Sequence, residues 1–142
     1  YYGSEWGVPG SKSHGGDPAL RPHLVLEEME KNPPVPGLEE YIAFLGKCRE
    51  EYPVIGQGRY RELLLTNRQY AFARMGQGEA VVTAVNNDDK EAELVIPLPM
   101  EASSLHDLET GEELKAEGGR VRILLPEGGS ILIGVNTSPK AE

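Results

Sequence analysis

The sequence predicts a mainly β protein, in which an antiparallel β-sandwich or barrel follows a loop and one clear helix. From Gly58 onward, apolar and polar residues alternate with a period of two, and turn-forming residues separate the short alternating segments. No helical pattern lies between these segments, which is typical of antiparallel sheets rather than of α/β folds. Before Gly58 the apolar spacing is instead that of a helix.

Seven strands are expected in the C-terminal part of the chain. In one of them Ala92, Leu94 and Ile96 share a face, as expected for a half-buried strand. Turn chemistry, such as the glycines of Gly76–Gly78, lies between the strands. The expected strands are Arg59–Thr66, Gln69–Arg74, Glu79–Asn86, Glu91–Ile96, Leu105–Leu108, Arg120–Leu125 and Ser130–Val135.

The clearest helix is predicted over residues 38–52, LEEYIAFLGKCREEY, and Pro53 ends it. Its apolar stripe consists of Leu38, Tyr41, Ile42, Leu45, Cys48 and Tyr52. Since Cys48 lies on this stripe and no histidine is near it in sequence, we interpret it as a core residue rather than a nucleophile.

Residues 1–36 read as a loop, with at most a short helix near Ala19–Lys31. Asp17 would be the N-cap of that helix and Pro18 its first residue. The segment NPPVPG, Asn32–Gly37, would stop the helix and act as a stiff connector.

Composition excludes several classes of function. The chain has 142 residues and a formal net charge of −9, so phosphate backbones and anionic membranes are poor partners. A single cysteine excludes an internal disulfide, and three scattered histidines offer no metal site, so we expect neither metal nor cofactor. No apolar run approaches the roughly 18–20 residues of a transmembrane helix. We therefore expect a soluble protein, with the cytoplasm as the favoured compartment.

The aromatic residues of the β region, Tyr60, Tyr70 and Phe72, all lie inside expected strands. Packing in the core or across strands is the favoured interpretation, and a platform for stacking sugar rings is the alternative.

Several motifs resemble the α-amylase family of glycoside hydrolases (family 13). The opening YYGSE, with Asp17 and Arg21 four residues apart after a glycine-rich loop, resembles the loop after the last strand of the family's catalytic (β/α)8 barrel. The helix segment, with Leu45, Arg49, Pro53 and Gly58, looks like the final barrel helix. The segments YAFAR, VVTAVNN, LHDLETGEEL and LPEGGSILI look like strands of the family's C-terminal β-sandwich, which is Greek-key-like.

This resemblance implies two domains. Residues 1–54 would be the last loop and helices of a catalytic barrel, and residues 55–142 would be the C-terminal sandwich. Neopullulanases, cyclomaltodextrinases and maltodextrin glucosidases are the most similar members. The catalytic carboxylates of the family come from strands in the middle of the barrel, so the chain by itself is not expected to be an enzyme. Its partners would be the missing barrel and, through the parent enzyme, an α-glucan or maltooligosaccharide.

The resemblance also implies a substrate-binding role in the parent cleft for Asp17 and Arg21, which match a pair that contacts a glucose unit. A carboxylate accepts from neighbouring hydroxyls and a guanidinium donates in a fixed fork, which suits a sugar. Trp6 would either line the cleft or staple the loop. No catalytic residue is expected within the chain.

Three functions compete at this point. The chain is part of an α-glucan-acting hydrolase whose sandwich stabilises the barrel, an independent carbohydrate-binding module, or an interaction domain. The β region has no tryptophan to stack on sugars, which favours the first.

Overall fold

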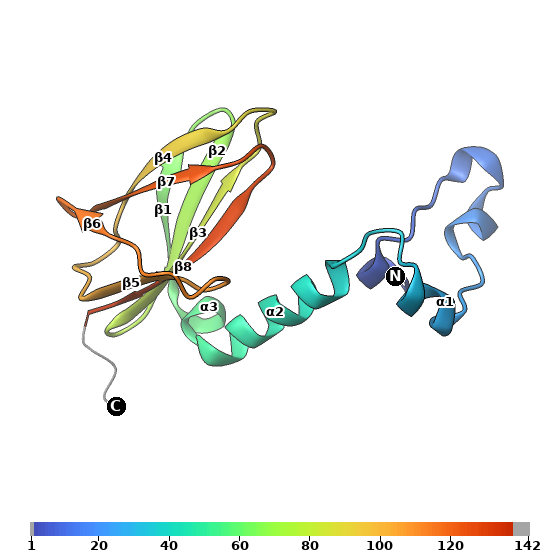
Figure 1. The fold of residues 1–142 in the computed structure, drawn as a ribbon, viewed down its shortest axis with the longest axis horizontal. Helices are drawn as coiled ribbons and strands as arrows, with labels where there is room; N and C mark the ends of the chain where they lie inside the picture. Colours follow the sequence, from blue (N-terminus) through green and yellow to red (C-terminus); the bar gives the residue numbers. More distant parts are fainter. Residues whose placement is uncertain (1, 138–142) are drawn as a thin grey trace. The chain divides into compact units, whose positions relative to one another are not determined.

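The computed structural model describes residues 2–137 (Figure 1). The chain divides into two compact units, Tyr1–Lys47 and Cys48–Glu142. We call them the N-terminal unit and the sandwich unit, and each is described by itself. Among residues 2–137, no helix combines the length and the apolar character that crossing a membrane requires.

The N-terminal unit consists of short turns of helix joined by loops. Of the short helix expected near Ala19–Lys31, only the second half forms, because Arg21 to Val25 are not helical and separate a turn from a short helix. The N-cap prediction for Asp17 is also wrong: Gly16 holds that position, and no side chain caps the turn. The elements are η1 (Ser4–Trp6), η2 (Lys12–His14), η3 (Asp17–Leu20) and α1 (Leu26–Lys31).

The expected long helix is confirmed as α2 (Leu38–Glu51), which runs across the division between the units. Its predicted stripe is buried only at its C-terminal end, where Cys48 is 4% exposed. Ile42 and Leu45, on the same stripe, are 46% and 39% exposed. The interpretation of Cys48 as a core residue is therefore confirmed, while the middle of the stripe is exposed.

A further short helix, α3 (Val54–Gln57), follows Pro53 and was not predicted. Gly58 comes directly after it, where the chain turns into the first strand. A Cβ atom on Gly58 would lie 2.6 Å from the carbonyl oxygen of Val54 and 2.8 Å from that of Met75. Only glycine allows the helix and the sheet to approach this closely.

All seven expected strands form, each to within one residue at both ends. An eighth, two-residue strand (β6) was missed because two residues are too short to show a period. The strands are β1 (Arg59–Leu65), β2 (Gln69–Met75), β3 (Glu79–Asn86), β4 (Ala92–Pro97), β5 (Ser104–Asp107), β6 (Ala116–Glu117), β7 (Arg120–Leu125) and β8 (Ser130–Asn136).

The strands form two antiparallel sheets, so the mainly β prediction is confirmed (Figure 1). Sheet A has the strand order β1-β2-β3-β8-β5, and sheet B has the order β4-β7-β6. The pairing of β3 with β8, far apart in sequence, is the crossed connection of a Greek key. The sequence predicted either a sandwich or a barrel, and the two separate sheets show that the fold is a sandwich.

The core lies between the two sheets, and part of it packs alanines of sheet A with larger side chains of sheet B. Sheet A contributes the fully buried Ala71, Ala73 and Ala84, and sheet B contributes Leu94 and Ile96, 2% and 0% exposed. Large side chains opposite alanines allow the two layers to interdigitate at close packing.

One polar residue, Asn86, is buried at the end of β3 with 1% exposure. Its Nδ2 donates to the carbonyl oxygens of Lys90 (2.8 Å) and Pro126 (2.9 Å). Its Oδ1 accepts from Nε2 of Gln69 at 3.0 Å. Asn86 therefore joins sheet A to the turn that leaves β7 of sheet B.

Candidate functional site

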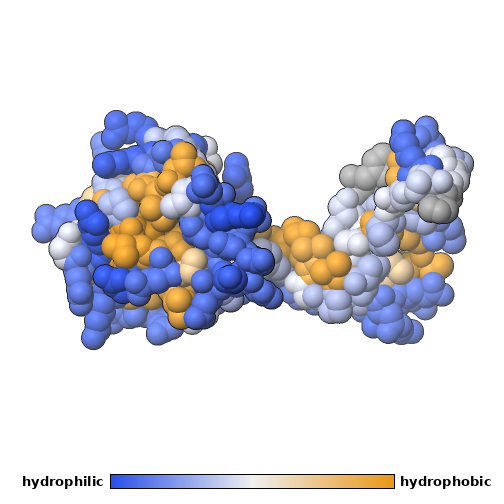
Figure 2. Space-filling view, turned by 90° about the horizontal axis from the view of Figure 1, so that it is seen from above, coloured by the Kyte–Doolittle hydropathy of each residue, from blue (hydrophilic) through white to orange (hydrophobic). Residues whose placement is uncertain are grey.

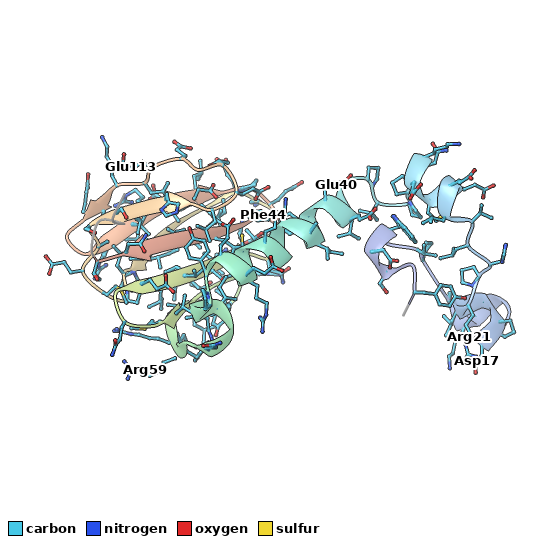
Figure 3. The ribbon with its side chains drawn as sticks, turned by 90° about the horizontal axis from the view of Figure 1, so that it is seen from below. Asp17, Arg21, Glu40, Phe44, Arg59 and Glu113 are labelled. Carbon is cyan, nitrogen blue, oxygen red and sulfur yellow. The ribbon has the colours of Figure 1, made fainter. Side chains whose placement is uncertain are left out.

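The candidate site is a hollow of about 430 Å3 inside the N-terminal unit. It contains both residues of the pair that the sequence singled out, Asp17 and Arg21, which Figure 3 shows in the same loop. The lining residues are Tyr2, Ser4, Val8, Pro9, Gly10, Lys12, Asp17, Leu20, Arg21 and Pro22.

Backbone turns give the hollow its shape. The hydroxyl of Tyr2 donates to the carbonyl oxygen of Pro22 at 3.0 Å, which ties the start of the loop to its end. The amide of Gly16 donates to the carbonyl oxygen of Lys12 at 3.2 Å and brings Lys12 back toward η3. Asp17 begins η3 and Arg21 follows its last residue, so one turn presents both side chains.

Lys12 was missed by the sequence reasoning, although it lies beside the predicted pair. Its Nζ lies 3.0 Å from Oδ1 of Asp17, and both side chains are about two-thirds exposed, at 69% and 66%. An ion pair this exposed contributes little to stability, typically about 0–1 kcal/mol. Lys12 belongs to a segment without regular pattern, and only the folded loop brings its charge to Asp17.

Trp6 does not line the hollow. Its indole Nε1 donates to Oε2 of Glu39 at 3.0 Å, and its carbonyl oxygen accepts from the amide of Val35 at 3.0 Å. These two contacts connect η1 to the start of α2, which favours the stapling alternative for Trp6. Its role in the cleft of a larger enzyme stays a prediction.

The hollow is lined by three charged side chains. Asp17 is the one carboxylate among the lining residues, and Lys12 and Arg21 supply positive charge. A retaining glycosidase needs two carboxyl groups about 5–5.5 Å apart, and the lining contains no such pair. Within residues 2–137, no three His, Cys, Asp or Glu side chains are grouped as metal ligands would be.

In the sandwich unit, the aromatic residues lie on the outer face of sheet A and not in the core. The rings of Tyr60 and Tyr70 each lie 5.7 Å from that of Phe72, so the cross-strand part of the packing prediction is confirmed and the core part is wrong. The phenol oxygens of Tyr60 and Tyr70 are hydrogen-bonded to each other. This bond raises the pKa of Tyr70 to about 12.

Cys48 has the environment of an unreactive thiol. Burial raises its pKa, and the neighbouring carboxylate of Glu51 raises the pKa further. A thiol with a raised pKa carries little of the reactive thiolate at neutral pH, so Cys48 is not a candidate nucleophile.

Comparisons with known proteins find similar sequences and structures that cover almost the whole chain. No family model matches. A cyclomaltodextrinase of Geobacillus thermopakistaniensis is 27% identical over 139 residues, which are 96% of this chain and 22% of that enzyme. The chain thus spans about a fifth of its curated relative.

Two solved structures are similar in fold. An Anoxybacillus α-amylase has a TM-score of 0.78 at 22% identity, covering 99% of this chain and 29% of that enzyme. The α-amylase of Geobacillus thermoleovorans, solved with acarbose, has a TM-score of 0.76 at 19% identity, with the same coverage of 99% and 29%.

The fold is thus that of a β-sandwich and its preceding helix, as they occur within multidomain carbohydrate-active enzymes. The similarity is to the C-terminal portion of α-amylase-family glycoside hydrolases, so the resemblance that the motifs indicated is confirmed.

Proposed function

We propose that the chain is the C-terminal part of an α-glucan-acting glycoside hydrolase, in which the sandwich stabilises the catalytic barrel. Residues 1–54 would complete the barrel, and Asp17 and Arg21 would bind a glucose unit at the edge of the cleft. The chain supplies binding and stability in this proposal, and the catalytic carboxylates belong to the rest of the enzyme.

One observation carries the proposal. The two residues that match the family's sugar-binding pair line the same hollow, in a loop already closed by the bond between Tyr2 and Pro22. An exposed carboxylate beside a guanidinium offers acceptors and donors for sugar hydroxyls. The solved relative that contains acarbose supports an oligosaccharide as the ligand class.

A two-dimensional amide NMR titration with maltoheptaose tests the binding part. We expect millimolar binding, because half a cleft offers few contacts, with shifts confined to the hollow. Arg21→Lys, which keeps the charge but removes the fork, should abolish these shifts. Glu27→Gln, which removes an exposed carboxylate of the same unit, is the control and should leave them intact. The absence of shifts at any concentration would contradict a preformed binding site.

A carbohydrate-binding module is the second candidate, and one observation favours it. Tyr60 is 53% exposed next to two further aromatic rings, which is an arrangement able to stack on sugars. Shifts on β1 and β2 in the same titration, with none at the hollow, would favour this candidate over the first.

A further inference from the structure

The surface of the sandwich unit is not uniform in character. Figure 2 shows an apolar area on one of its faces, among hydrophilic residues. Basic side chains also gather in one place, at a hollow of about 280 Å3 on sheet B. Three basic residues line this hollow, although the whole chain has a net charge of −9. The lining residues are Val95, Lys115, Glu117, Arg120, Val121 and Arg122.

A tight turn shapes one side of the hollow. Gly118 and Gly119 join β6 to β7, and their φ angles are positive, at 57° and 72°. Two successive residues with positive φ are typical of the type I′ turn of a two-residue hairpin, and glycine adopts them at little cost. The turn places Glu117 directly opposite Arg120 and so fixes the register of the two strands.

This register brings like charges together on the outer face of sheet B. Arg120 and Arg122 alternate with buried residues along β7, so both side chains point away from the core. Lys115 lies two residues before Glu117, on the strand that pairs with β7, and lines the same hollow as the two arginines. Like charges on neighbouring strands are destabilising, so the fold alone gives no reason to gather them.

The positive charge of the hollow is only partly neutralised. Arg122 donates through Nη1 to Oε1 of Glu93 at 2.5 Å. A guanidinium has five N–H donors, so others remain for a ligand. In the part of the chain that the structure describes, residues 2–137, neither Lys115 nor Arg120 forms an ion pair. Glu117 is the one carboxylate among the lining residues.

We infer that this hollow binds a small molecule that carries a phosphate monoester. The guanidinium groups of Arg120 and Arg122 present forked donors that match phosphate oxygens, and Lys115 adds a compact positive charge. Pockets for small molecules measure about 300–1,000 Å3, so a hollow of about 280 Å3 suits a ligand of small size. The inference does not depend on the proposed function, because it uses only residues of the sandwich unit.

The net charge of the chain favours a small anion over a large one. Electrostatic interactions are screened within about 8 Å at physiological ionic strength, so a phosphate in the hollow interacts mainly with the three basic residues that line it. A nucleic acid or an anionic membrane would extend beyond the hollow and meet the acidic remainder of the surface. A phosphorylated metabolite, such as a sugar phosphate, is therefore the ligand class.

A two-dimensional amide NMR titration of the 142-residue chain with glucose 6-phosphate, at constant ionic strength, tests the inference. We expect millimolar binding, with shifts at β4, β6 and β7, and no shifts there with glucose. Inorganic phosphate shows which part of the ligand is recognised. Equal binding would mean that the phosphate group alone is bound, and weaker binding would mean that the sugar contributes, and both results agree with the inference.

Three variants of equal or opposite charge change sharpen the test. Arg120→Gln should weaken the binding of glucose 6-phosphate by about tenfold, because it removes charged hydrogen bonds to the phosphate. Arg59→Gln is the control, since it removes the same charge from an exposed arginine at the start of β1 and should leave the binding intact. Glu117→Gln should strengthen the binding several-fold, which a merely unfolded variant could not do.

Several outcomes would overturn the inference. The absence of shifts at β4, β6 and β7, or equal shifts with glucose, would exclude a phosphate site. Equal weakening by Arg59→Gln and Arg120→Gln would show that the ligand responds to the overall charge and not to the hollow. If Arg120→Gln loses the dispersed spectrum of a folded chain, Lys115→Gln takes its place, and unchanged binding by that variant would contradict the site.

Discussion

The interactions inside the N-terminal unit differ from those inside the sandwich unit. The buried hydrophobic residues of the described chain all lie between Cys48 and Val135, and the core between the sheets contains most of them. Residues 2–47 contain no buried hydrophobic side chain among those described, and their contacts include single hydrogen bonds such as those of Tyr2 and Trp6. Burial of apolar surface is the dominant favourable term in folding, so we expect the sandwich unit to fold alone and the N-terminal unit to depend on neighbouring structure.

Limited proteolysis tests most directly whether the two units differ in stability, and we expect it to show the largest effect of the four experiments. We predict rapid loss of the residues before Gly37, leaving a resistant core from about Leu38 onward. A difference of about 3 kcal/mol in the free energy of opening corresponds to a rate ratio of roughly a hundredfold. Mass spectrometry of a trypsin and thermolysin time course would measure it, and uniform resistance along the chain would contradict the prediction.

A cavity in the core should destabilise the sandwich unit strongly. Ile96→Ala, at a residue with 0% exposure between the sheets, should lower the free energy of unfolding by about 2–5 kcal/mol. Urea unfolding monitored by circular dichroism measures this change. Leu24→Ala in the N-terminal unit is the control, and a similar loss there would show that the two units fold as one.

Loss of the buried amide of Asn86 should have the next largest effect. In Asn86→Ala the partners at Lys90, Pro126 and Gln69 lose their hydrogen bonds inside the protein. An unsatisfied buried polar group costs about 1–3 kcal/mol, and the free energy of unfolding should fall by that amount. Urea unfolding measures it. Asn87→Ala, next to it and exposed, should change little, and an equal effect would refute the role of Asn86 between the sheets.

The smallest expected effect is a pH dependence of the hydrogen-bonded pair Tyr60 and Tyr70 on the outer face of sheet A. The pKa of Tyr70 is raised from its ordinary value of 10.0 to about 12, so the neutral phenol is favoured in the folded chain. Its contribution to stability is complete below pH 10.0 and is lost as the pH rises through about 12. An absorbance titration should show one late tyrosine, and Tyr60→Phe should move that titration toward lower pH. An unchanged titration would contradict the hydrogen bond between the two tyrosines.

The sequence predicted the sandwich unit much better than the N-terminal unit, for a physical reason. Strands such as Arg120–Leu125 alternate strictly between exposed and buried residues and end at turn residues, so the local pattern agrees with the burial in the folded protein. The helix α3 was missed because four residues between a proline and a glycine read as a turn. In the N-terminal unit, Pro22 and the extended Val25 interrupt the helical pattern that the leucines suggested.

The candidate site could be predicted only because its loop resembles a loop of a known family. Asp17 and Arg21 are ordinary charged residues in a loop, and no periodicity marks them. Lys12 could not be found at all, because its position beside Asp17 depends on the backbone turn that Gly16 closes onto it.

The irregularity in β1 has a consequence for how the free chain behaves in concentrated solution. The pairing with β2 skips Leu63, so the strand at this border of sheet A carries a bulge between Glu62 and Leu64. A regular border strand offers a row of free amides and carbonyls as a template for strands of other molecules, and a bulge disrupts that row. Copies of this chain should therefore meet side chain to side chain, in contacts that dilution reverses, rather than extend one another's sheets into fibrils.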